Sequence, residues 1–422
     1  AHAIHCYKSE HKSSLLQAVN AVIKDLSGAY GLCVFDKRNP DQIIAARSGS
    51  PLIIGVGIGE NFIASDPAAL GQVTDRFVYL EEGDVALITL DDVSIWHKSR
   101  RVKRAITTIP RSSADSDKGK FQHFMLKEIY EQPKSITETL IGRISKTKVL
   151  EQAFGLNADI VFDKVKHVQI VACGTSYHAG LIAKYWLESV AKLSCQVDVA
   201  SDYRYRSIVS HPSTLFVTIS QSGETADTLA ALKYSKKFSY VASLSICNVA
   251  TSALVRESDL CLLTMAGKEV GVASTKAFLG QLTVLYILCL KLAIVRKDID
   301  EITYGINISN LKKLPEAIKE CITLESNVQL MAKEFLSAKG SMFLGRGSSF
   351  PIALEGALKL KELSYWHAEG YPAGEMKHGP LALIEEGLPV IILAPKDKYF
   401  EKTLSNMQEV IARGGKILFI TD

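Results

Sequence analysis

A run of short hydroxyl side chains follows an apolar segment near the middle of the chain. The segment "TLFVTIS" is typical of a buried strand, and the next residues, starting from its final serine, read "SQSGET". Ser220, Ser222 and Thr225 can donate hydroxyl protons, and Gly223 lets a ligand approach the backbone closely. A helix that begins here would add free backbone N–H groups and a partial positive charge. Because no lysine follows, as it does in nucleotide-binding loops, the stretch predicts a site for a single phosphate, as on a sugar.

The alternative interpretation of this stretch is a simple helix cap at Ser222 or Thr225. Two other turns leave the same two interpretations open. "CGTSYHAG" places Thr175 and Ser176 directly after an apolar strand, where they would face the same crevice. "KEVGVASTKAF" places Ser274 just before a long apolar helix.

The ionisable groups that could do chemistry lie in "LEGALKLKELSYWHAEGYPAGEMKHGPLAL". Glu355, Lys359 and Glu362 are spaced so that all three share one face of a helix. Glu362 precedes a segment that we interpret as a loop, and His378 lies in that loop. A carboxylate and an imidazole near a phosphate pocket suit general acid–base chemistry on a sugar. The alternative is a solvated Glu–Lys pair on an amphipathic helix, which we prefer for Lys361.

The elements that must position these residues follow an α/β pattern. From about His167, apolar strands alternate with longer helical segments, as in a parallel, doubly wound sheet whose ligands bind beyond the carboxyl ends of the strands. The pattern then recurs, because "VQIVACGTSYHAGLIAKYWLE" is similar to "GSMFLGRGSSFPIALEGALKLKE", with Gly174 matching Gly347. In the second copy "APKDKY" replaces "SQSGET". The hydroxyl-rich turn is therefore not needed for the fold, which favours a functional role.

The rest of the chain reads as supporting structure. Residues 26–95 contain short apolar or alternating runs broken by Gly, Asn and Asp, which predict β-structure. "PRSSADSDKGK" is the best linker candidate, and "FQHFMLKEIYEQP" predicts a helix that ends before Pro133. "AFLGQLTVLYILCLKLAIV" contains a glutamine and a lysine and is short for a membrane span, so we expect a buried helix.

Composition limits the classes of function. The chain has 422 residues and a net charge of +4, which is too small to imply a nucleic-acid partner by itself. Eight cysteines without paired spacing indicate reduced thiols in a cytosolic protein, and we find no signal peptide. His2, His5, Cys6 and His11 fit no standard zinc pattern, so we expect no metal site there.

Several of these motifs, in this order, resemble the glutamine–fructose-6-phosphate aminotransferase (isomerizing) family in its bacterial form. They are "KEIYEQP", "CGTSYHAG", "SQSGETADTL", "GVASTKAF", "LGRGSSFPIALEGALKLKELSY" and "HAEGYPAGEMKHGPLALI", and the likeness runs from "GAYGLCVFD" to "ARGGKILF". The resemblance implies glutamine-dependent conversion of fructose 6-phosphate to glucosamine 6-phosphate. It implies no cofactor, no metal, a cytoplasmic homodimer, and neither nucleic acid nor membrane as a partner.

The implied fold is α/β, with two tandem SIS (sugar isomerase) domains whose sheets are parallel and doubly wound. The C-terminal part of an α+β, N-terminal-nucleophile glutaminase domain would precede them. The expected divisions are a partial glutaminase at 1–108, a linker and connecting helix at 109–156, the first SIS domain at 157–297, a helical connection at 298–329 and the second SIS domain at 330–422.

The resemblance also implies roles for individual residues. The phosphate would be held by Ser176, Ser220, Gln221, Ser222 and Thr225, and the sugar would be met by Thr175, Val272 and Ser274. Glu362 would move the proton between C1 and C2, and Lys359 would assist proton traffic. His378 would assist ring opening from the neighbouring subunit.

Two features of the family have no counterpart in the chain. The nucleophilic cysteine would lie upstream of Ala1, and no motif matches the lysine near the family's C-terminus that forms a Schiff base with the sugar. We therefore expect a chain cut at both ends, which binds sugar phosphate but releases no glutamate from L-glutamine. Two rival functions remain open, namely a phosphosugar isomerase that uses no ammonia and a non-enzymatic phosphosugar sensor.

Overall fold

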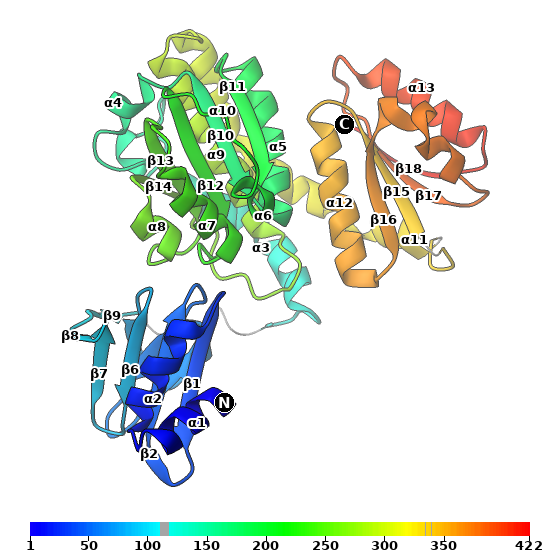
Figure 1. Cartoon of the computed structure of the whole chain (residues 1–422). Coiled ribbons are helices and arrows are strands. Elements are labelled where there is room, and N and C mark those ends of the chain that lie inside the picture. Colours follow the sequence, from blue (N-terminus) through cyan, green and yellow to red (C-terminus); the bar gives the residue numbers. More distant parts are fainter. Residues whose placement is uncertain (110–117, 334, 339) are drawn as a thin grey trace. The chain divides into compact units, whose positions relative to one another are not determined.

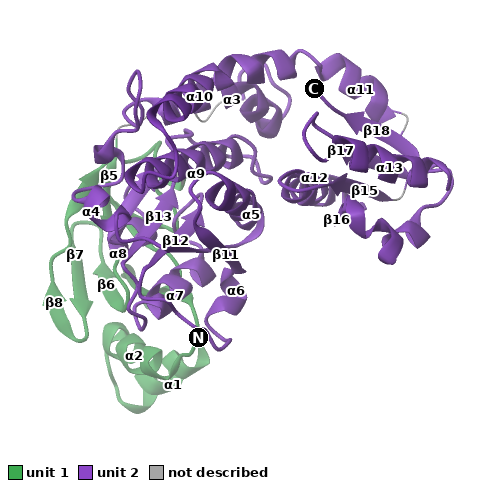
Figure 2. Ribbon diagram, turned by 90° about the horizontal axis from the view of Figure 1, so that it is seen from above, with its two compact units in different colours: residues 1–117 green, residues 118–422 purple. Residues whose placement is uncertain are grey.

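The computed structural model describes residues 1–109, 118–333, 335–338 and 340–422. The chain divides into two compact units, Ala1–Asp117 and Lys118–Asp422, which Figure 2 colours green and purple. All but three residues of the predicted linker "PRSSADSDKGK" lie outside the described residues.

The first unit is built from antiparallel β-structure and two helices, as the sequence of residues 26–95 predicts. One sheet has the strand order β1-β2-β6-β7-β8 and the other the order β4-β3-β5-β9. The elements are α1 (His2–Glu10), α2 (Leu15–Val22), β1 (Tyr30–Asp36), β2 (Asn39–Ser48), β3 (Ile53–Val56), β4 (Asn61–Ala64), β5 (Arg76–Tyr79), β6 (Asp84–Ile88), β7 (Val93–His97), β8 (Arg100–Val102) and β9 (Ile106–Thr108).

The second unit contains the predicted parallel sheet, with strand order β11-β10-β12-β13-β14 and every neighbouring pair parallel (Figure 1). Its elements are α3 (Phe124–Leu140), α4 (Ala158–Phe162), β10 (His167–Ala172), α5 (Gly174–Ser189), β11 (Ser194–Val199), α6 (Ala200–Tyr203), β12 (Thr214–Ser220), α7 (Ala226–Ser235), β13 (Ala242–Cys247), α8 (Ala253–Glu257), β14 (Leu260–Leu263) and α9 (Lys276–Val295). Strand β11 is not predicted from the sequence because, as an edge strand, it lacks the continuous apolar run from which the other strands of this sheet are recognised.

Helices cover both faces of this sheet. Side chains of α5 and α9 share one buried cluster with the sheet residues Ile170, Val217 and Leu244. Side chains of α6, α7 and α8 share another with Val171 and Phe216, which point to the opposite face. By length and composition α9 is apolar enough to span a membrane, yet most of its residues are buried inside the fold. The prediction of a buried helix is confirmed.

A second parallel sheet follows, with strand order β16-β15-β17-β18. Its elements, after the connecting helices α10 (Glu301–Ile322) and α11 (Glu325–Lys333), are β15 (Gly340–Gly345), α12 (Ser349–Ser364), β16 (His367–Pro372), β17 (Pro389–Leu393), α13 (Phe400–Ile411) and β18 (Lys416–Ile420). This order matches β11-β10-β12-β13 strand for strand, so the predicted duplication is confirmed. Much of the segment interpreted as a loop after Glu362 instead forms β16 and the 3₁₀ helix η5 (Ala373–His378). Because an edge strand pairs on one side only, its polar residues do not exclude it from the sheet.

Helix α3 continues past Pro133, so the predicted end of that helix is wrong. A proline lacks the N–H that would bond to the carbonyl four residues earlier, which here belongs to Ile129. The side-chain amide of Gln132 donates to that carbonyl oxygen at 2.9 Å. A side chain thus replaces the missing backbone bond, while the ring of Pro133 is buried.

We expect Gln132→Ala to lower the free energy of unfolding by about 1 kcal/mol, because the Ile129 carbonyl loses its partner. Urea denaturation measures the change. Glu138→Ala on the same helix is the control, since Glu138 makes only an exposed pair with Lys134. In a Pro133→Ala background the backbone N–H returns, so Gln132→Ala should cost less there. An equal cost in both backgrounds would contradict the replacement.

Candidate functional site

A cavity of about 210 Å³ lies at the carboxyl ends of β10 and β12. Its lining consists of Cys173, Thr175, Ser176, Ile219, Ser220, Gln221, Ser222, Thr225, Thr228, Ser274 and Gln281. Seven of the eight residues predicted to bind the phosphate or the sugar are therefore brought together, and the eighth is Val272. The lining is rich in hydroxyl groups, and none of these residues carries a charge.

The turn after β12 has a shape that only glycine permits at its centre. Gly223 has φ +69°, and a Cβ there would lie 2.1 Å from the hydroxyl oxygen of Ser252. Its N–H donates to the Ser220 hydroxyl at 3.0 Å, and that hydroxyl lies 2.8 Å from the hydroxyl of Thr225. The hydrogen bond between the Ser220 and Thr225 hydroxyls therefore fixes their positions in the ligand-free protein.

Ser222 differs from its neighbours in the turn. Its hydroxyl accepts a bond from the N–H of Glu224 at 3.2 Å, and no bond uses its own proton among the residues described. The helices α5 and α7 both begin at the cavity, after Cys173 and Thr225. Free N–H groups and the positive ends of two helix dipoles therefore border a cavity with unused hydroxyl protons, among them those of Ser222 and Thr228, which suits an anion.

The third predicted turn, "KEVGVASTKAF", holds two of the residues predicted to bind the sugar, Val272 and Ser274, and only one of them lines the cavity. Ser274 lines the cavity and donates its hydroxyl proton to Glu269 at 2.9 Å. The same carboxylate accepts the N–H groups of Thr275 and Ala277 and so caps the start of α9. The side chain of Val272 is 96% exposed and does not line the cavity. A role for Val272 therefore rests on its backbone and stays a prediction.

Glu355 is the buried charge at this site, and the sequence analysis treats it only as a partner of Lys359. Its carboxylate, on α12, accepts the hydroxyl proton of Thr175 at 2.8 Å and lies 2.7 Å from Nδ1 of His178 on α5. Both views place α12 beside α5 (Figures 1 and 2). The sequence holds a signal for His178, because it follows Thr175 at a spacing of three and so shares its helix face.

Opposing influences act on the Glu355 carboxyl. Burial raises its pKa, but the hydrogen bond with His178, the charge of Lys359 and the hydrogen bond from Thr175 together lower it below its usual range. Lys359 Nζ lies 3.4 Å from Glu355 and donates to the Thr175 hydroxyl at 3.2 Å. The cavity is thus connected through Thr175 to a buried ion pair.

Glu362 joins this group and His378 does not. Lys359 Nζ pairs with the Glu362 carboxylate at 2.8 Å, so the shared helix face predicted for Glu355, Lys359 and Glu362 is confirmed. The side chain of Glu362 is 36% exposed and is open to a ligand. His378 is exposed at the end of the 3₁₀ helix η5 (Ala373–His378) and makes no hydrogen bond within the part of the chain that the structure describes.

Three comparisons with known proteins bear on this site. The SIS domain family matches residues 162–291 and 334–422. The glutamine–fructose-6-phosphate aminotransferase [isomerizing] of Pseudomonas putida is 54% identical over 97% of this chain and 67% of its own length, and that of Pseudomonas syringae is 53% identical over 100% and 69%. The solved C-terminal domain of glucosamine-fructose-6-phosphate aminotransferase from Francisella tularensis is 48% identical, with a TM-score of 0.71 over 72% of this chain and 86% of that domain.

The lowered pKa of Glu355 predicts how its contribution to stability varies with pH. Its folded pKa lies below the value of about 4.3 for an unfolded chain, so the stabilisation is complete above that pH and is lost as pH falls through the folded value. At neutral pH, Glu355→Gln should lower the free energy of unfolding by about 2 kcal/mol. This gap between the two proteins should narrow when the pH falls below about 4.

Urea unfolding of both proteins at neutral and acid pH measures the gap. Glu369→Gln is the control, because Glu369 makes only an exposed pair with Lys361 at 3.1 Å and should matter little at either pH. A gap for Glu355→Gln that stays constant with pH would mean that its ionised form is not what stabilises the fold.

Proposed function

The chain belongs to the glutamine–fructose-6-phosphate aminotransferase (isomerizing) family, and from this premise we propose that its cavity holds fructose 6-phosphate while the sugar is converted to glucosamine 6-phosphate. One observation carries the proposal. The hydroxyl-lined cavity at two helix starts is joined, through Thr175, to the ion pair of Lys359 and Glu362. An anion site and a proton-transfer group thus lie within reach of one small ligand.

The phosphate group of fructose 6-phosphate would bind at the turn after β12. Ser176, Ser220, Gln221, Ser222 and Thr225 line the cavity there and would hold the phosphate oxygens. The hydroxyl proton of Ser222 makes no bond among the described residues, and the N-termini of α5 and α7 supply partial positive charge. The charge of the ester would be met by dipoles and hydrogen bonds alone.

The carbon chain of fructose 6-phosphate would lie on the side of the cavity nearest α12. The Thr175 hydroxyl donates a hydrogen bond to Glu355 and accepts one from Lys359. Its remaining lone pair can therefore accept a hydrogen bond from a sugar hydroxyl. Ser274 and the backbone at Val272 would contact the same part of the ligand. Glu362 would take the proton from C1 and return it at C2, and Lys359 would hold that carboxylate in place.

The remaining assignments concern partners and location. We propose a homodimer in which His378 serves the site of the neighbouring copy, since it is exposed and makes no hydrogen bond among the described residues of its own chain. L-glutamine would supply the amino group, and the divisions 1–108, 109–156, 157–297, 298–329 and 330–422 stay part of the proposal. The eight cysteines are free, which supports a cytoplasmic location.

Ser222→Ala should weaken the binding of fructose 6-phosphate by about 1–2 kcal/mol, the scale of a hydrogen bond to a charged group. Binding of unphosphorylated fructose, already weak, should not change. Calorimetry with both ligands measures this, and Ser189→Ala is the control, because the Ser189 hydroxyl donates to the Tyr185 carbonyl of its own helix and does not line the cavity. Equal losses for both ligands would show that the turn does not hold the phosphate.

Glu362→Gln should leave the binding of fructose 6-phosphate nearly intact but slow proton transfer by roughly 100-fold or more, the scale of losing a general base. Exchange of the C1 proton of fructose 6-phosphate with deuterated solvent, followed by NMR, reports that step directly. Glu369→Gln is again the matched control. Exchange near the wild-type rate in Glu362→Gln would mean that another group moves the proton.

A further inference from the structure

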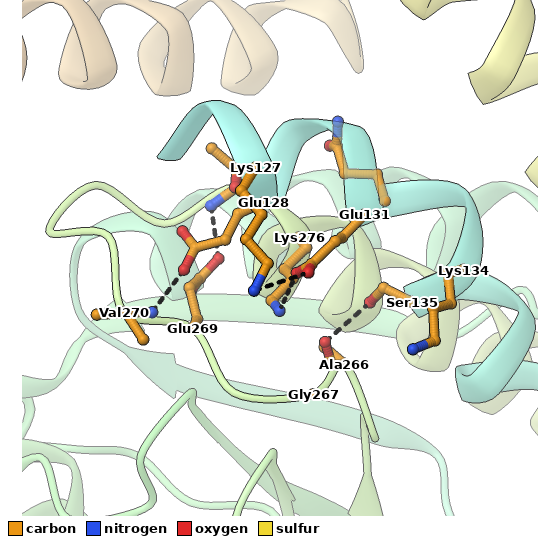
Figure 3. Close-up of polar contacts among 12 residues, drawn as sticks. Lys127, Glu128, Glu131, Lys134, Ser135, Ala266, Gly267, Glu269, Val270 and Lys276 are labelled. Carbon is orange, nitrogen blue, oxygen red and sulfur yellow. Dashed lines mark hydrogen bonds and ion pairs between the residues drawn. The ribbon is translucent and has the colours of Figure 1, made fainter. Parts of the chain in front are cut away.

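One face of α3 is bonded to the loop between β14 and α9, residues 264–275, which we call the sugar loop, and to Lys276 at the start of α9 (Figure 3). Thr139 donates to the Thr264 carbonyl at 2.6 Å, Ser135 donates to the Ala266 carbonyl at 3.3 Å, and Lys276 pairs with Glu131 at 2.8 Å. The helix residues Glu128, Glu131, Ser135 and Thr139 recur at intervals of three and four, so they project from one side of α3.

Glu128 contacts the sugar loop three and four residues before Ser274, which lines the cavity. Its Oε1 accepts the N–H of Val270 at 2.5 Å and that of Gly271 at 3.0 Å, and its Oε2 lies 3.3 Å from the latter. Glu128 is only 2% exposed. A buried carboxylate is costly unless it is hydrogen-bonded, and so is a buried N–H group, so each satisfies the other.

The backbone of the sugar loop lies directly against this carboxylate. A Cβ on Gly271 would be 2.6 Å from Oε2 of Glu128 and 3.4 Å from the backbone of Met125. The next residue is Val272, and Ser274, which lines the cavity, follows two residues later. Glu269 holds Ser274 from the other side by accepting its hydroxyl proton. Two carboxylates therefore fix the short segment that faces the ligand.

We propose that Glu128 is a positioning residue for the sugar part of the ligand, acting through the N–H groups of Val270 and Gly271 on the sugar loop. The identity of the ligand rests on the proposed function. Because the phosphate turn, residues 220–225, lies between β12 and α7 and not in this loop, Glu128 sets the affinity for the carbon chain and leaves phosphate capture unchanged.

Hydrogen exchange tests the contact between Glu128 and the N–H groups of Val270 and Gly271, which we call the clamp, without any ligand. In the full 422-residue chain, Glu128→Ala should speed amide exchange at least about tenfold in peptides that cover Val270 and Gly271, because both amides lose their acceptor. Glu128→Gln keeps one oxygen for them and should stay within about threefold of the wild type. Glu138→Ala, on the same helix, should change nothing. Unchanged amide exchange in Glu128→Ala would overturn the proposal that Glu128 holds the N–H groups of Val270 and Gly271.

Calorimetry tests the consequence for the ligand. Glu128→Ala should raise the Kd for fructose 6-phosphate about tenfold while the Kd for inorganic phosphate stays within about twofold, and Glu128→Gln should restore most of the affinity. An equal rise for both ligands would overturn the proposal, because it would indicate a general disturbance of the cavity. If the wild-type chain bound neither ligand, the proposed function would fail, and the exchange result for the clamp would still stand.

A second variant decides the matter if Glu128→Ala does not fold. Gly271→Ala keeps the carboxylate but pushes against it, since the new Cβ would lie 2.6 Å from Oε2. The same selective loss of affinity for fructose 6-phosphate over inorganic phosphate is expected, although smaller. Wild-type affinity for both ligands in Gly271→Ala would count against a close fit between the sugar loop and α3.

Discussion

The buried carboxylate of Glu355 is the interaction on which the rest of the site depends. It comes from the second parallel sheet's helix α12 and is satisfied by Thr175 and His178 on helix α5 of the first. A buried charge tolerates little displacement, because any lost hydrogen bond leaves it unpaired. The hydrogen bonds from Glu355 to Thr175 and His178 therefore set the distance between the cavity and the Lys359–Glu362 pair.

The two copies of the duplicated fold carry different groups of polar side chains. The two sheets share one strand order, yet the first copy has a hydroxyl-rich turn after its third strand in that order and the second has "APKDKY". The second copy instead carries Glu355, Lys359 and Glu362 on its first helix. In the proposed function, anion recognition would therefore reside on the first copy and proton transfer on the second, so neither sheet would have to carry both.

The sequence predicts the parts of this molecule whose signals are local. The strand–helix alternation, the buried helix α9 and the grouping of Thr175, Ser220 and Ser274 all follow from short patterns and from the rule that parallel strands end on one edge. The contact between Glu355 and His178 joins residues 177 positions apart, and no local pattern encodes it. The extension of α3 past Pro133 depends on the side chain of Gln132, which a rule about proline alone cannot supply. Edge strands β11 and β16 are missed because neither has the continuous apolar run that marks the central strands of a parallel sheet.

The absence of charged side chains from the lining of the cavity has a consequence for how ligands exchange. An anion held by hydroxyls, N–H groups and helix dipoles interacts over a few ångströms, whereas an anion held by lysine or arginine is attracted over a Debye length of about 8 Å at physiological ionic strength. Such a cavity gains little from long-range steering, so its rate of capture and its affinity should depend only weakly on salt. In the proposed function, a phosphorylated product would leave this cavity without being separated from a charged lining residue, and we expect this to favour rapid release.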